Sequence, residues 1–416
     1  MRILFVSPYL PHGAIGHGGG TVVFELLRCL ARSHEICLLC FQREGERGKE
    51  RELVEAGVKV ELIPYRSGED RGLKRVFTVL DRTLRIMFSA FSGRPYRSVR
   101  YSHRGMKQRL LRLVREWEPD AVQVEFFAMA PYAREILRYK AEASGEGPLV
   151  VLSTHEVESL VRLRRLMDAK NWLSRSIASL RLRRIRRYEC RAIGWADRVL
   201  CVSEQDRQVL LGLSSSNRLF TLPLGVPLAR LPEALPNFDA PPRILFVGSF
   251  AHPPNRQAAD FIVKELVPAL RREQPGLVCE IVGRNPPADL RAAAEASRGA
   301  VMIHGFVPEL EPVFARAWLF VAPLFSGGGI KIKILEALGR GSPVLTTPIG
   351  LDGIDAPVGE AVGCAGDAAQ FIQQCSSLLS RPELLSSWGR RGREYIAHNH
   401  DWPLLADRLC KILAEE

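Results

Sequence analysis

The chain has 416 residues, 46% of them hydrophobic and 25% charged, and these ordinary globular values exclude a disordered or fibrous protein. Its 58 Lys and Arg outnumber its 46 Asp and Glu, and the net charge of +12 favours anionic partners such as phosphates, nucleic acid or an acidic membrane surface without choosing among them. Nine widely spaced Cys, an odd number, are typical of reduced thiols rather than of a disulfide framework.

The first half of the sequence alternates short apolar runs with helix-like or charged segments. A glycine-rich loop at 13–20 follows the first run, and residues 21–32 have the apolar spacing of a helix. Such alternation is typical of a parallel sheet that helices cover on both faces. The strands predicted in this half are 3–6, 36–41, 58–63, 121–124, 149–152 and 199–202.

A basic segment at 162–191 stands out within this half. It carries eleven basic and two acidic residues, which is most of the surplus charge, interleaved with Leu, Ile and one Trp. A basic amphipathic helix of this kind can lie on an anionic bilayer, and a solvated helix face explains the pattern about equally well. We hypothesise that the segment docks the protein on the inner membrane surface. Nucleic acid is a weaker hypothesis, because no aromatic-bearing recognition motif accompanies the charge.

A proline-rich segment at 226–242 separates the two halves. Its five prolines remove amide donors and discourage regular structure, which is typical of a linker. The alternation then restarts, so we expect two domains of roughly 200 residues each. The elements predicted in the second half are strands 244–247, 279–282, 302–304, 318–323 and 343–346 and helices 257–272 and 333–339.

This organisation predicts the fold class α/β, with two Rossmann-like lobes facing a central cleft. The predicted divisions are an N-terminal lobe 1–225, the linker 226–242, a C-terminal lobe 243–390, and a helical segment 391–416 that packs back on the N-terminal lobe. No stretch approaches about 20 uninterrupted apolar residues, so no helix is expected to span a membrane. The N-terminal apolar run is too short for a secretion signal, and Pro8 and Pro11 follow it where small residues would mark cleavage. We therefore expect a cytoplasmic protein.

The glycine-rich loop of the first half, Gly16-His-Gly-Gly-Gly20, sits between a predicted strand and a predicted helix. Glycines let the backbone approach a ligand closely, and a helix N-terminus offers unpaired amides to a phosphate. The loop does not fit the dinucleotide-binding fingerprint, because no third glycine follows in step, and it lacks the Lys of a phosphate-binding Walker loop. Taken alone it is a weak signal.

A stronger pattern occupies 323–347. A strand ends at Pro323, three glycines make a turn, and a helix follows that begins with Lys331 and Lys333. Lysines and free amides then lie at the end of a parallel strand, where open α/β sheets bind ligands. Glu336 lies one turn beyond Lys333, so its carboxylate can accept two ribose hydroxyls while the lysine and the amides hold a diphosphate. The alternative, an exposed Lys–Glu pair on a helix, is less favoured because three successive glycines precede it.

The segment Gly328-Gly-Ile-Lys-Ile-Lys-Ile-Leu-Glu-Ala-Leu-Gly-Arg-Gly-Ser-Pro-Val-Leu-Thr resembles the donor-binding block of glycosyltransferase family 4, and most closely its exopolysaccharide-type sugar transferases. The resemblance extends over nearly the whole chain and implies a GT-B enzyme that uses a nucleotide-activated sugar. It implies that the lobe 1–225 receives the acceptor and that the lobe 243–390 binds the nucleotide sugar. Supporting segments are 196–203, 222–226, 246–255, 281–286 and 304–312.

The resemblance also implies roles for individual residues. Glu336 would bind the nucleotide ribose, Lys333 the leaving diphosphate, and His155 would lie near the donor sugar, although a capping role for this histidine is equally consistent with its sequence context. Further donor-binding residues would be Gly18, Gly19, Gly20, Gly248, Ser249, Arg256, Arg284, Phe306, Val307, Gly328, Gly329 and Ile330, with the turn at 305–307 meeting the base.

Several positions depart from the family pattern. Gly328 replaces the first of two glutamates, which leaves the sugar open, and Ser249 and Pro254 replace an Arg and a Lys, with Arg256 as a substitute. No Asp-x-Asp or His-x-x-x-His cluster occurs, so we expect metal-independent catalysis without a cofactor, the nucleotide-diphosphate sugar being a substrate. The resemblance implies retention of configuration and a glycan or lipid-linked acceptor. The alternatives are a catalytically silent sugar-nucleotide-binding scaffold subunit and a nucleotide-sugar epimerase.

Overall fold

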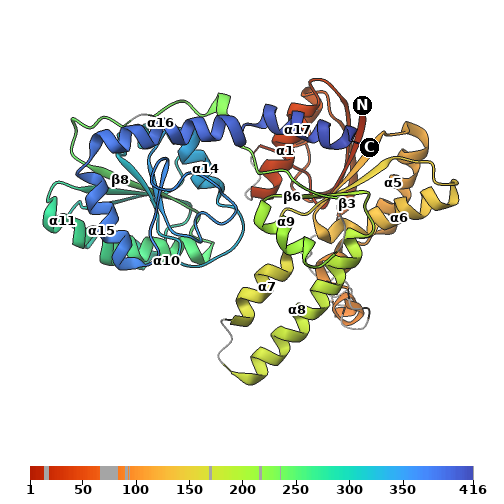
Figure 1. Cartoon of the computed structure of the whole chain (residues 1–416), viewed down its shortest axis with the longest axis horizontal. Helices are drawn as coiled ribbons and strands as arrows, with labels where there is room; N and C mark the ends of the chain where they lie inside the picture. Colours follow the sequence, from red (N-terminus) through yellow and green to blue (C-terminus); the bar gives the residue numbers. More distant parts are fainter. Residues whose placement is uncertain are drawn as a thin grey trace. The chain divides into compact units, whose positions relative to one another are not determined.

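A computed structural model describes residues 1–13, 18–65, 83–89, 92, 94–167, 171–214, 218–234 and 236–415. The chain divides into two compact units, one made of 1–223 with 405–416 and the other of 224–404 (Figure 1). The predicted end of the first lobe, residue 225, therefore lies within two residues of the division between the units.

A seven-stranded parallel sheet forms the centre of the first unit. Its order is β3-β2-β1-β4-β5-β6-β7, so the chain reverses its winding direction at β1. The strands are nearly continuous runs of buried apolar residues because helices cover both faces of the sheet. They are β1 (Arg2–Ser7), β2 (Glu35–Arg43), β3 (Lys59–Tyr65), β4 (Ala121–Glu125), β5 (Leu149–Ser153), β6 (Arg198–Cys201) and β7 (Leu219–Thr221). All six strands predicted for this half are present, and β7 was not predicted, because its three residues are too short to show a pattern.

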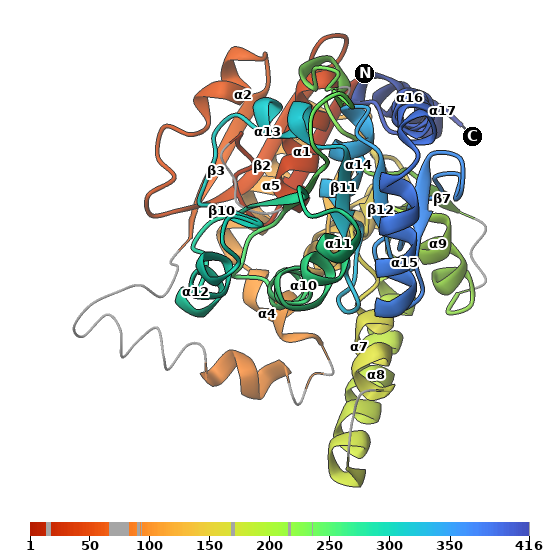
Figure 2. The same ribbon diagram turned by 90° about the vertical axis from the view of Figure 1, so that its left-hand side faces the viewer.

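The helices of the first unit alternate with these strands. They are α1 (Gly18–Leu30), α2 (Arg51–Glu55), α4 (Tyr96–Tyr101), α5 (Arg104–Trp117), α6 (Ala130–Glu142), α7 (Glu158–Met167), α8 (Trp172–Ile193), α9 (Glu204–Leu211) and, from Leu405 onward, α17 (Trp402–Ala414). The predicted basic segment 162–191 comprises most of α7 and α8, which form a hairpin that extends away from the sheet of this unit (Figure 2). Asn171 caps α8 by accepting a hydrogen bond from the Ser174 amide.

A six-stranded parallel sheet forms the centre of the second unit, in the order β10-β9-β8-β11-β12-β13. The strands are β8 (Arg243–Val247), β9 (Val278–Val282), β10 (Val301–His304), β11 (Leu319–Ala322), β12 (Val344–Thr346) and β13 (Val362–Cys364). Its helices are α10 (Pro253–Phe261), α11 (Val267–Glu273), α12 (Ala288–Ala296), α13 (Glu311–Arg316), α14 (Ile332–Gly339), α15 (Ala368–Leu379) and α16 (Pro382–Asn399). The predicted helix 257–272 is α10 and α11 joined by a π-helical turn at Ile262–Leu266, which ends two residues before Pro268, a residue with no amide to donate.

The proline-rich segment 226–242 lies within the second unit rather than forming a separate linker. The Trp318 indole donates to the Asn237 carbonyl at 3.0 Å, and the Ala234 amide donates to the Arg340 carbonyl at 2.7 Å. These bonds give the segment fixed partners on the body of the unit, which its lack of periodicity did not reveal.

The C-terminal segment 391–416 is divided between the units. Residues 224–404 include the end of α16, whereas the residues from Leu405 onward belong to the first unit. There the His34 ring lies 3.1 Å from the Cys410 sulfur, and the Arg198 guanidinium donates to the Ile412 carbonyl. Only the last twelve residues of the predicted segment therefore lie with the N-terminal part of the chain.

Candidate functional site

The turn between β11 and α14 carries the strongest sequence pattern in the second unit. Gly327 and Gly329 have φ values of 113° and 72°, which L-residues with side chains rarely adopt. The turn brings the chain from the carboxyl end of β11 to Ile332, where α14 begins. The first amides of α14 therefore lie at the strand end, where they have no partner within the helix.

Lys333 lies in the first turn of α14 and is held by groups from β8 and α10. Its Nζ donates to Asn255 Oδ1 at 2.6 Å and lies 4.6 Å from the centre of the Phe246 ring. A Cβ on Gly248 would come within 2.7 Å of Nζ, so the glycine at the end of β8 makes room for the amine. Loss of hydration around Nζ, helped by the nearby Lys331, lowers the pKa of Lys333 to about 7.

Glu336 follows one turn later on the same helix and is half-buried. Burial raises the pKa of its carboxyl, against the opposite effect of Arg340 and Lys333. Within the described part of the chain, its carboxylate makes no hydrogen bond and no ion pair. Both oxygens are therefore available to accept hydrogen bonds from a ligand.

Two residues at the start of α10 belong to this site although the sequence analysis did not single them out. Asn255 is buried, and besides binding Lys333 it donates from Nδ2 to the Ser249 carbonyl at 2.9 Å. His252 precedes α10, and partial burial together with Lys333 and Lys331 lowers its pKa. Asn255 lies in the first turn of the helix that follows β8, and it reaches Lys333 only because β8 pairs with β11 in the sheet, which the sequence pattern does not show.

The neighbouring strands β9 and β10 end in a second pair of predicted residues. The Arg284 guanidinium lies 4.2 Å from the centre of the Phe306 ring, and Phe306 is 61% exposed. An exposed aromatic face beside a guanidinium can stack against a planar base. The other predicted residues of this lobe lie in the turns at the same sheet edge: Val307 after β10, and Gly328 and Ile330 between β11 and α14.

Arg256 lies on α10 but is engaged in ion pairs. Its guanidinium binds Asp260 at 2.7 Å and also binds Asp289, and these carboxylates raise its pKa. Two aspartates compensate its charge, which makes Lys333 the better placed cation at the strand ends. A donor-binding role for Arg256 stays a prediction.

In the first unit, His155 forms a buried pair with Glu125. Its Nε2 lies 2.5 Å from Glu125 Oε2, and Gln123 Nε2 donates to Glu125 Oε1 at 2.7 Å. The His155 and Glu125 side chains are 7% and 1% exposed. The imidazole therefore binds a carboxylate at the end of β4, and within the part of the chain that the structure describes its ring makes no hydrogen bond that caps a helix.

The backbone around this pair adopts an uncommon conformation. Phe126 and His155 have φ values of 69° and 52°, a region that costs a non-glycine residue about 1–3 kcal/mol. Their rings stack with centres 3.9 Å apart and 13° between planes. Strain held by surrounding structure is characteristic of functional positions.

The glycines at the start of α1 pack against the same ring. A Cβ on Gly19 would lie 2.9 Å from Phe126 Cζ and 3.1 Å from Tyr9 Oη. Gly18, Gly19 and Gly20 form the first turn of α1, three residues earlier than the predicted helix start, and residues 14–17 of the predicted loop lie outside the described residues. The structure thus brings the predicted Gly19 and His155 to one cluster through Phe126, which the sequence analysis missed together with Glu125 and Tyr9.

Two properties of the described residues bear on the partners of the protein. No three or more His, Cys, Asp and Glu side chains in that part of the chain are grouped so that they could hold a metal ion. None of its helices combines the length and the apolar character needed to cross a bilayer.

Two parallel sheets, each with candidate ligand-binding groups at the carboxyl ends of its strands, define a protein of the two-lobed GT-B class. Residues 16–230 match the family model described as Glycosyltransferase Family 4, and residues 241–381 match that described as Glycosyl transferases group 1. The chain belongs to glycosyltransferase family 4.

The chain is also similar to a protein of a bacterial cps region. Over 164 residues the chain is 24% identical to an uncharacterised 44.6 kDa protein in the cps region of Klebsiella pneumoniae, a match that covers 38% of this chain and 42% of that protein. The chain thus spans less than half the length of that curated relative.

Two solved structures share the fold over almost their full length. A glycosyltransferase from Rickettsia africae has a TM-score of 0.66 at 14% identity, covering 99% of this chain and 97% of its own. HepE of Anabaena, solved in complex with UDP and glucose, has a TM-score of 0.63 at 12% identity, covering 100% of this chain and 99% of its own.

Proposed function

We propose that the protein transfers a sugar from a nucleotide-diphosphate donor to a glycan or lipid-linked acceptor. The observation that carries the proposal is the pair of groups on α14, where Asn255 holds the Lys333 ammonium at the strand ends and Glu336, one turn on, keeps an unpaired carboxylate. These groups match the diphosphate and the ribose of such a donor. HepE, which shares the fold, binds UDP and glucose, and this supports the same class of donor here.

The chemistry requires that negative charge developing on the departing diphosphate be stabilised. Lys333 and the first amides of α14 supply fixed positive ends where that charge develops. Because its pKa is about 7, Lys333 is only partly protonated in the free protein at neutral pH, and an anionic diphosphate favours its charged form. We propose that the transfer needs no metal ion and no cofactor, and that it retains the configuration of the sugar.

His155 supplies a polar group in the first unit. The Glu125 carboxylate accepts from Nε2 when that nitrogen carries the proton, and this fixes the ring orientation. We propose that the imidazole so held contacts the donor sugar.

Two results would contradict the proposals on metal and stereochemistry. Loss of activity on treatment with a chelator, with recovery on addition of a divalent cation, would contradict the metal-independent mechanism. A product whose anomeric proton signal shows the configuration opposite to that of the donor would contradict retention.

The proposal is tested by incubating the purified protein with a set of nucleotide sugars and measuring release of nucleotide diphosphate. We expect one donor to be turned over and Glu336→Ala to reduce donor affinity roughly 10- to 100-fold, because each charged hydrogen bond is worth about 1.5–3 kcal/mol. Glu295→Ala, at an exposed position of α12, is the matched control and should leave turnover unchanged. Turnover that Glu336→Ala leaves intact would refute the assignment of this site.

A silent sugar-nucleotide-binding subunit is the second candidate, because Gly328 removes a carboxylate that the resemblance leads one to expect. Measurements on the same purified protein distinguish the transferase from the silent subunit. A nucleotide sugar that raises the melting temperature without being turned over, with or without acceptor, would favour the silent subunit.

We propose further that the α7–α8 hairpin docks the protein on an anionic membrane surface. The end of the hairpin carries large exposed apolar side chains, Met167 at the end of α7 and Trp172 and Leu173 at the start of α8, with Trp172 78% exposed. A Trp at such a position partitions into the interface between lipid headgroups and acyl chains.

Arginines follow these apolar residues along α8. Seven exposed arginines, none with a carboxylate partner in the described part of the chain, can contact lipid phosphates, each contributing about 1 kcal/mol near an anionic surface. They are Arg175, Arg181, Arg183, Arg184, Arg186, Arg187 and Arg191. Asp168 and Lys170 of the predicted segment, and the side chains of Arg164 and Arg165, lie outside the described residues.

Co-sedimentation with vesicles tests the docking proposal. We expect binding to vesicles containing phosphatidylglycerol but not to pure phosphatidylcholine, and its loss in a variant that combines Trp172→Ser with Arg183→Gln and Arg187→Gln. Neutralising the exposed Arg272 and Arg298 of the second unit is the control, and it should preserve binding. Equal sedimentation of the two variants would contradict docking through the hairpin.

A further inference from the structure

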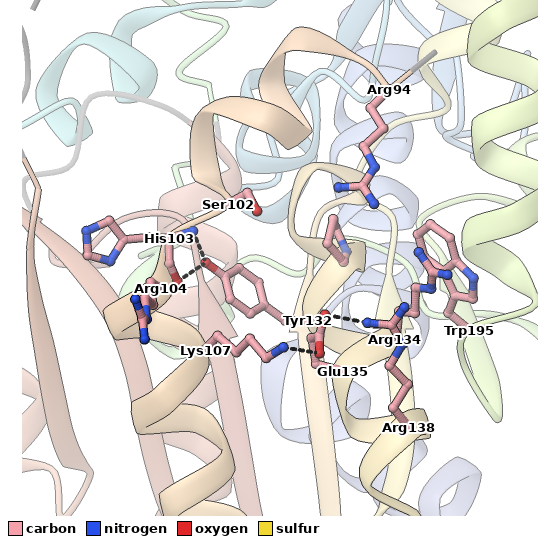
Figure 3. A pocket seen from close by; sticks show the side chains of 11 residues that line it. Arg94, Ser102, His103, Arg104, Lys107, Tyr132, Arg134, Glu135, Arg138 and Trp195 are labelled. Atoms are coloured by element: carbon pink, nitrogen blue, oxygen red, sulfur yellow. Dashed lines mark hydrogen bonds and ion pairs between the residues drawn. The ribbon is translucent and has the colours of Figure 1, made fainter. Parts of the chain in front are cut away.

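A pocket of about 300 Å³ lies in the first unit among residues that the candidate site does not use (Figure 3). The segments on either side of α4 and the N-terminal parts of α5 and α6 line it, and Trp195, two residues beyond the end of α8, contributes an aromatic ring. Its lining residues are Arg94, Ser102, His103, Arg104, Lys107, Pro131, Tyr132, Arg134, Glu135, Arg138 and Trp195.

Positive charge dominates this pocket. Its five Arg and Lys side chains face a single carboxylate, Glu135. Lys107 Nζ lies 2.6 Å from one Glu135 oxygen and Arg138 Nη1 lies 3.3 Å from the other. Glu135 is therefore already occupied by two cations.

The remaining three guanidiniums, those of Arg94, Arg104 and Arg134, have no carboxylate partner in the described part of the chain. Figure 3 shows Arg94 and Arg134 on the side of Trp195 and Arg104 on the opposite side, and Arg134 lies 5.5 Å from the centre of the Trp195 ring. Like charges gathered around a concave surface repel one another, and an anion that enters between them relieves this repulsion. Guanidiniums also present paired donors that match phosphate oxygens.

Internal hydrogen bonds fix the shape of the pocket. The buried Tyr132 hydroxyl donates to the Tyr101 carbonyl at 2.6 Å and accepts from the His103 amide at 3.0 Å. The His103 ring in turn caps α5 by accepting from the Met106 amide. The junction between α4 and α5 is thereby tied to α6, so the charged walls are positioned before any ligand binds.

An exposed apolar helix precedes the first lining residue of the pocket in the sequence. Residues 83–89 are helical, and Leu84, Ile86, Met87 and Phe88 are each about half exposed. Arg85 in this helix donates to the Val99 carbonyl of α4 at 3.0 Å, which attaches the helix to the element that ends at the pocket. A cationic pocket with an exposed apolar surface next to it suits a ligand that has an anionic head and an apolar tail.

We propose that this pocket binds the diphosphate group of a lipid-linked acceptor and that the apolar helix 83–89 contacts its hydrocarbon tail. The identification of the ligand as an acceptor rests on the proposed function. The binding of a diphosphate is argued from the pocket alone. The shared chemistry is a diphosphate anion, whose source is the lipid-linked acceptor or a soluble phosphate compound.

The test measures binding by calorimetry in a Lys333→Ala background, because this removes the cation of the nucleotide site from the measurement. Pyrophosphate and a short-chain isoprenyl diphosphate are the two probes. We expect both to bind, the isoprenyl diphosphate at least about tenfold more tightly, and Arg104→Gln combined with Arg134→Gln to weaken both at least about tenfold. Arg112→Gln, exposed on the same helix α5, is the matched control and should change affinity less than twofold.

Each outcome decides part of the proposal. Equal weakening by Arg112→Gln and by the pocket variant overturns the anion site, as does the absence of pyrophosphate binding. Equal affinity for the two probes overturns the lipid assignment and favours a soluble phosphate compound. Absence of sugar transfer by the wild-type protein would refute the proposed function while leaving the binding result intact, and unchanged melting temperatures establish that the variants fold.

Discussion

Asn255 and Lys333, 78 residues apart in the sequence, meet at the carboxyl edge of the second sheet with Oδ1 and Nζ 2.6 Å apart. The amide oxygen gives the ammonium a fixed position and leaves its charge in place. An aspartate at position 255 would neutralise that charge. The charge of Lys333 therefore remains available for an anionic ligand, and its protonation is sensitive to pH because its pKa is lowered from 10.5 to about 7.

The affinity for a nucleotide diphosphate should consequently fall as pH rises above 7. Below pH 7 the Lys333 amine is protonated and binds the diphosphate. Above pH 7 the affinity falls by up to about tenfold for each pH unit, until the pH passes the pKa that Lys333 has in the complex. Lys333→Arg stays protonated throughout and should show a flat profile between pH 7 and 9, apart from the titration of the nucleotide itself. Calorimetric titrations at pH 6.5, 7.5 and 8.5 measure the difference, and parallel profiles would contradict it.

The same lowered pKa implies that Lys333 destabilises the free protein. Between pH 7 and 10.5 the unfolded chain binds a proton at this residue that the folded chain does not, so stability from this group rises with pH through that window. Lys333→Met should therefore increase the free energy of unfolding by on the order of 1 kcal/mol or more below pH 7, while it abolishes nucleotide binding. Urea unfolding at pH 6.5 measures this, and destabilisation there would contradict the idea.

Gly19→Ala should disturb the His155 cluster through Phe126. The added methyl would meet Phe126 Cζ at 2.9 Å, so the ring that stacks on His155 must shift. We expect a loss of about 1–3 kcal/mol in stability, as for overpacking in general, together with a fall in kcat. Gly276→Ala, where a Cβ would meet no atom within 4 Å, is the control that should affect neither. Steady-state kinetics and thermal melts report the two effects, and equal behaviour of the two variants would dissociate Gly19 from the cluster.

Glu125→Gln should separate the charge of the carboxylate from its hydrogen bonds. The amide keeps the shape and can still accept from His155, but it carries no negative charge. We expect kcat to fall by about 10- to 100-fold, with a smaller change in KM. A purely structural role would lower stability and leave the kcat of the folded variant unchanged, and that result would refute the functional assignment of the pair.

The sequence predicts the two lobes and the positions of most of their strands along the chain, because a buried parallel strand is a run of apolar residues. Lys333 and Glu336 are predictable for a similar reason, since their spacing on one helix and the preceding glycines are local features. Asn255 and Glu125 are not, because their roles depend on which strands lie side by side: β8 beside β11, and β4 beside β5. The packing of 226–242 on the second unit was also hidden, because hydrogen bonds such as that of Trp318 to Asn237 leave no period in the sequence.

Glu189 offers a prediction at the base of the α7–α8 hairpin. It lies on α8, almost fully buried, and accepts a hydrogen bond from the Ser159 amide of α7 at 3.0 Å. Burial raises its pKa from 4.5 to about 7. The folded protein therefore holds a proton that the unfolded chain loses above pH 4.5, so stability falls as pH rises from about 4.5 to 7 and is constant above, a loss on the order of 3 kcal/mol.

Glu189→Gln should remove this pH dependence because the amide never ionises. We expect the variant to match the wild type at pH 5 and to exceed it by on the order of 1–3 kcal/mol at pH 8, measured by urea unfolding across that range. Glu142→Gln, exposed near the end of α6, serves as the control whose curve should follow that of the wild type. If the curves of Glu189→Gln and wild type run parallel from pH 5 to 8, Glu189 does not titrate in that interval and the hairpin base is not sensitive to pH through this residue.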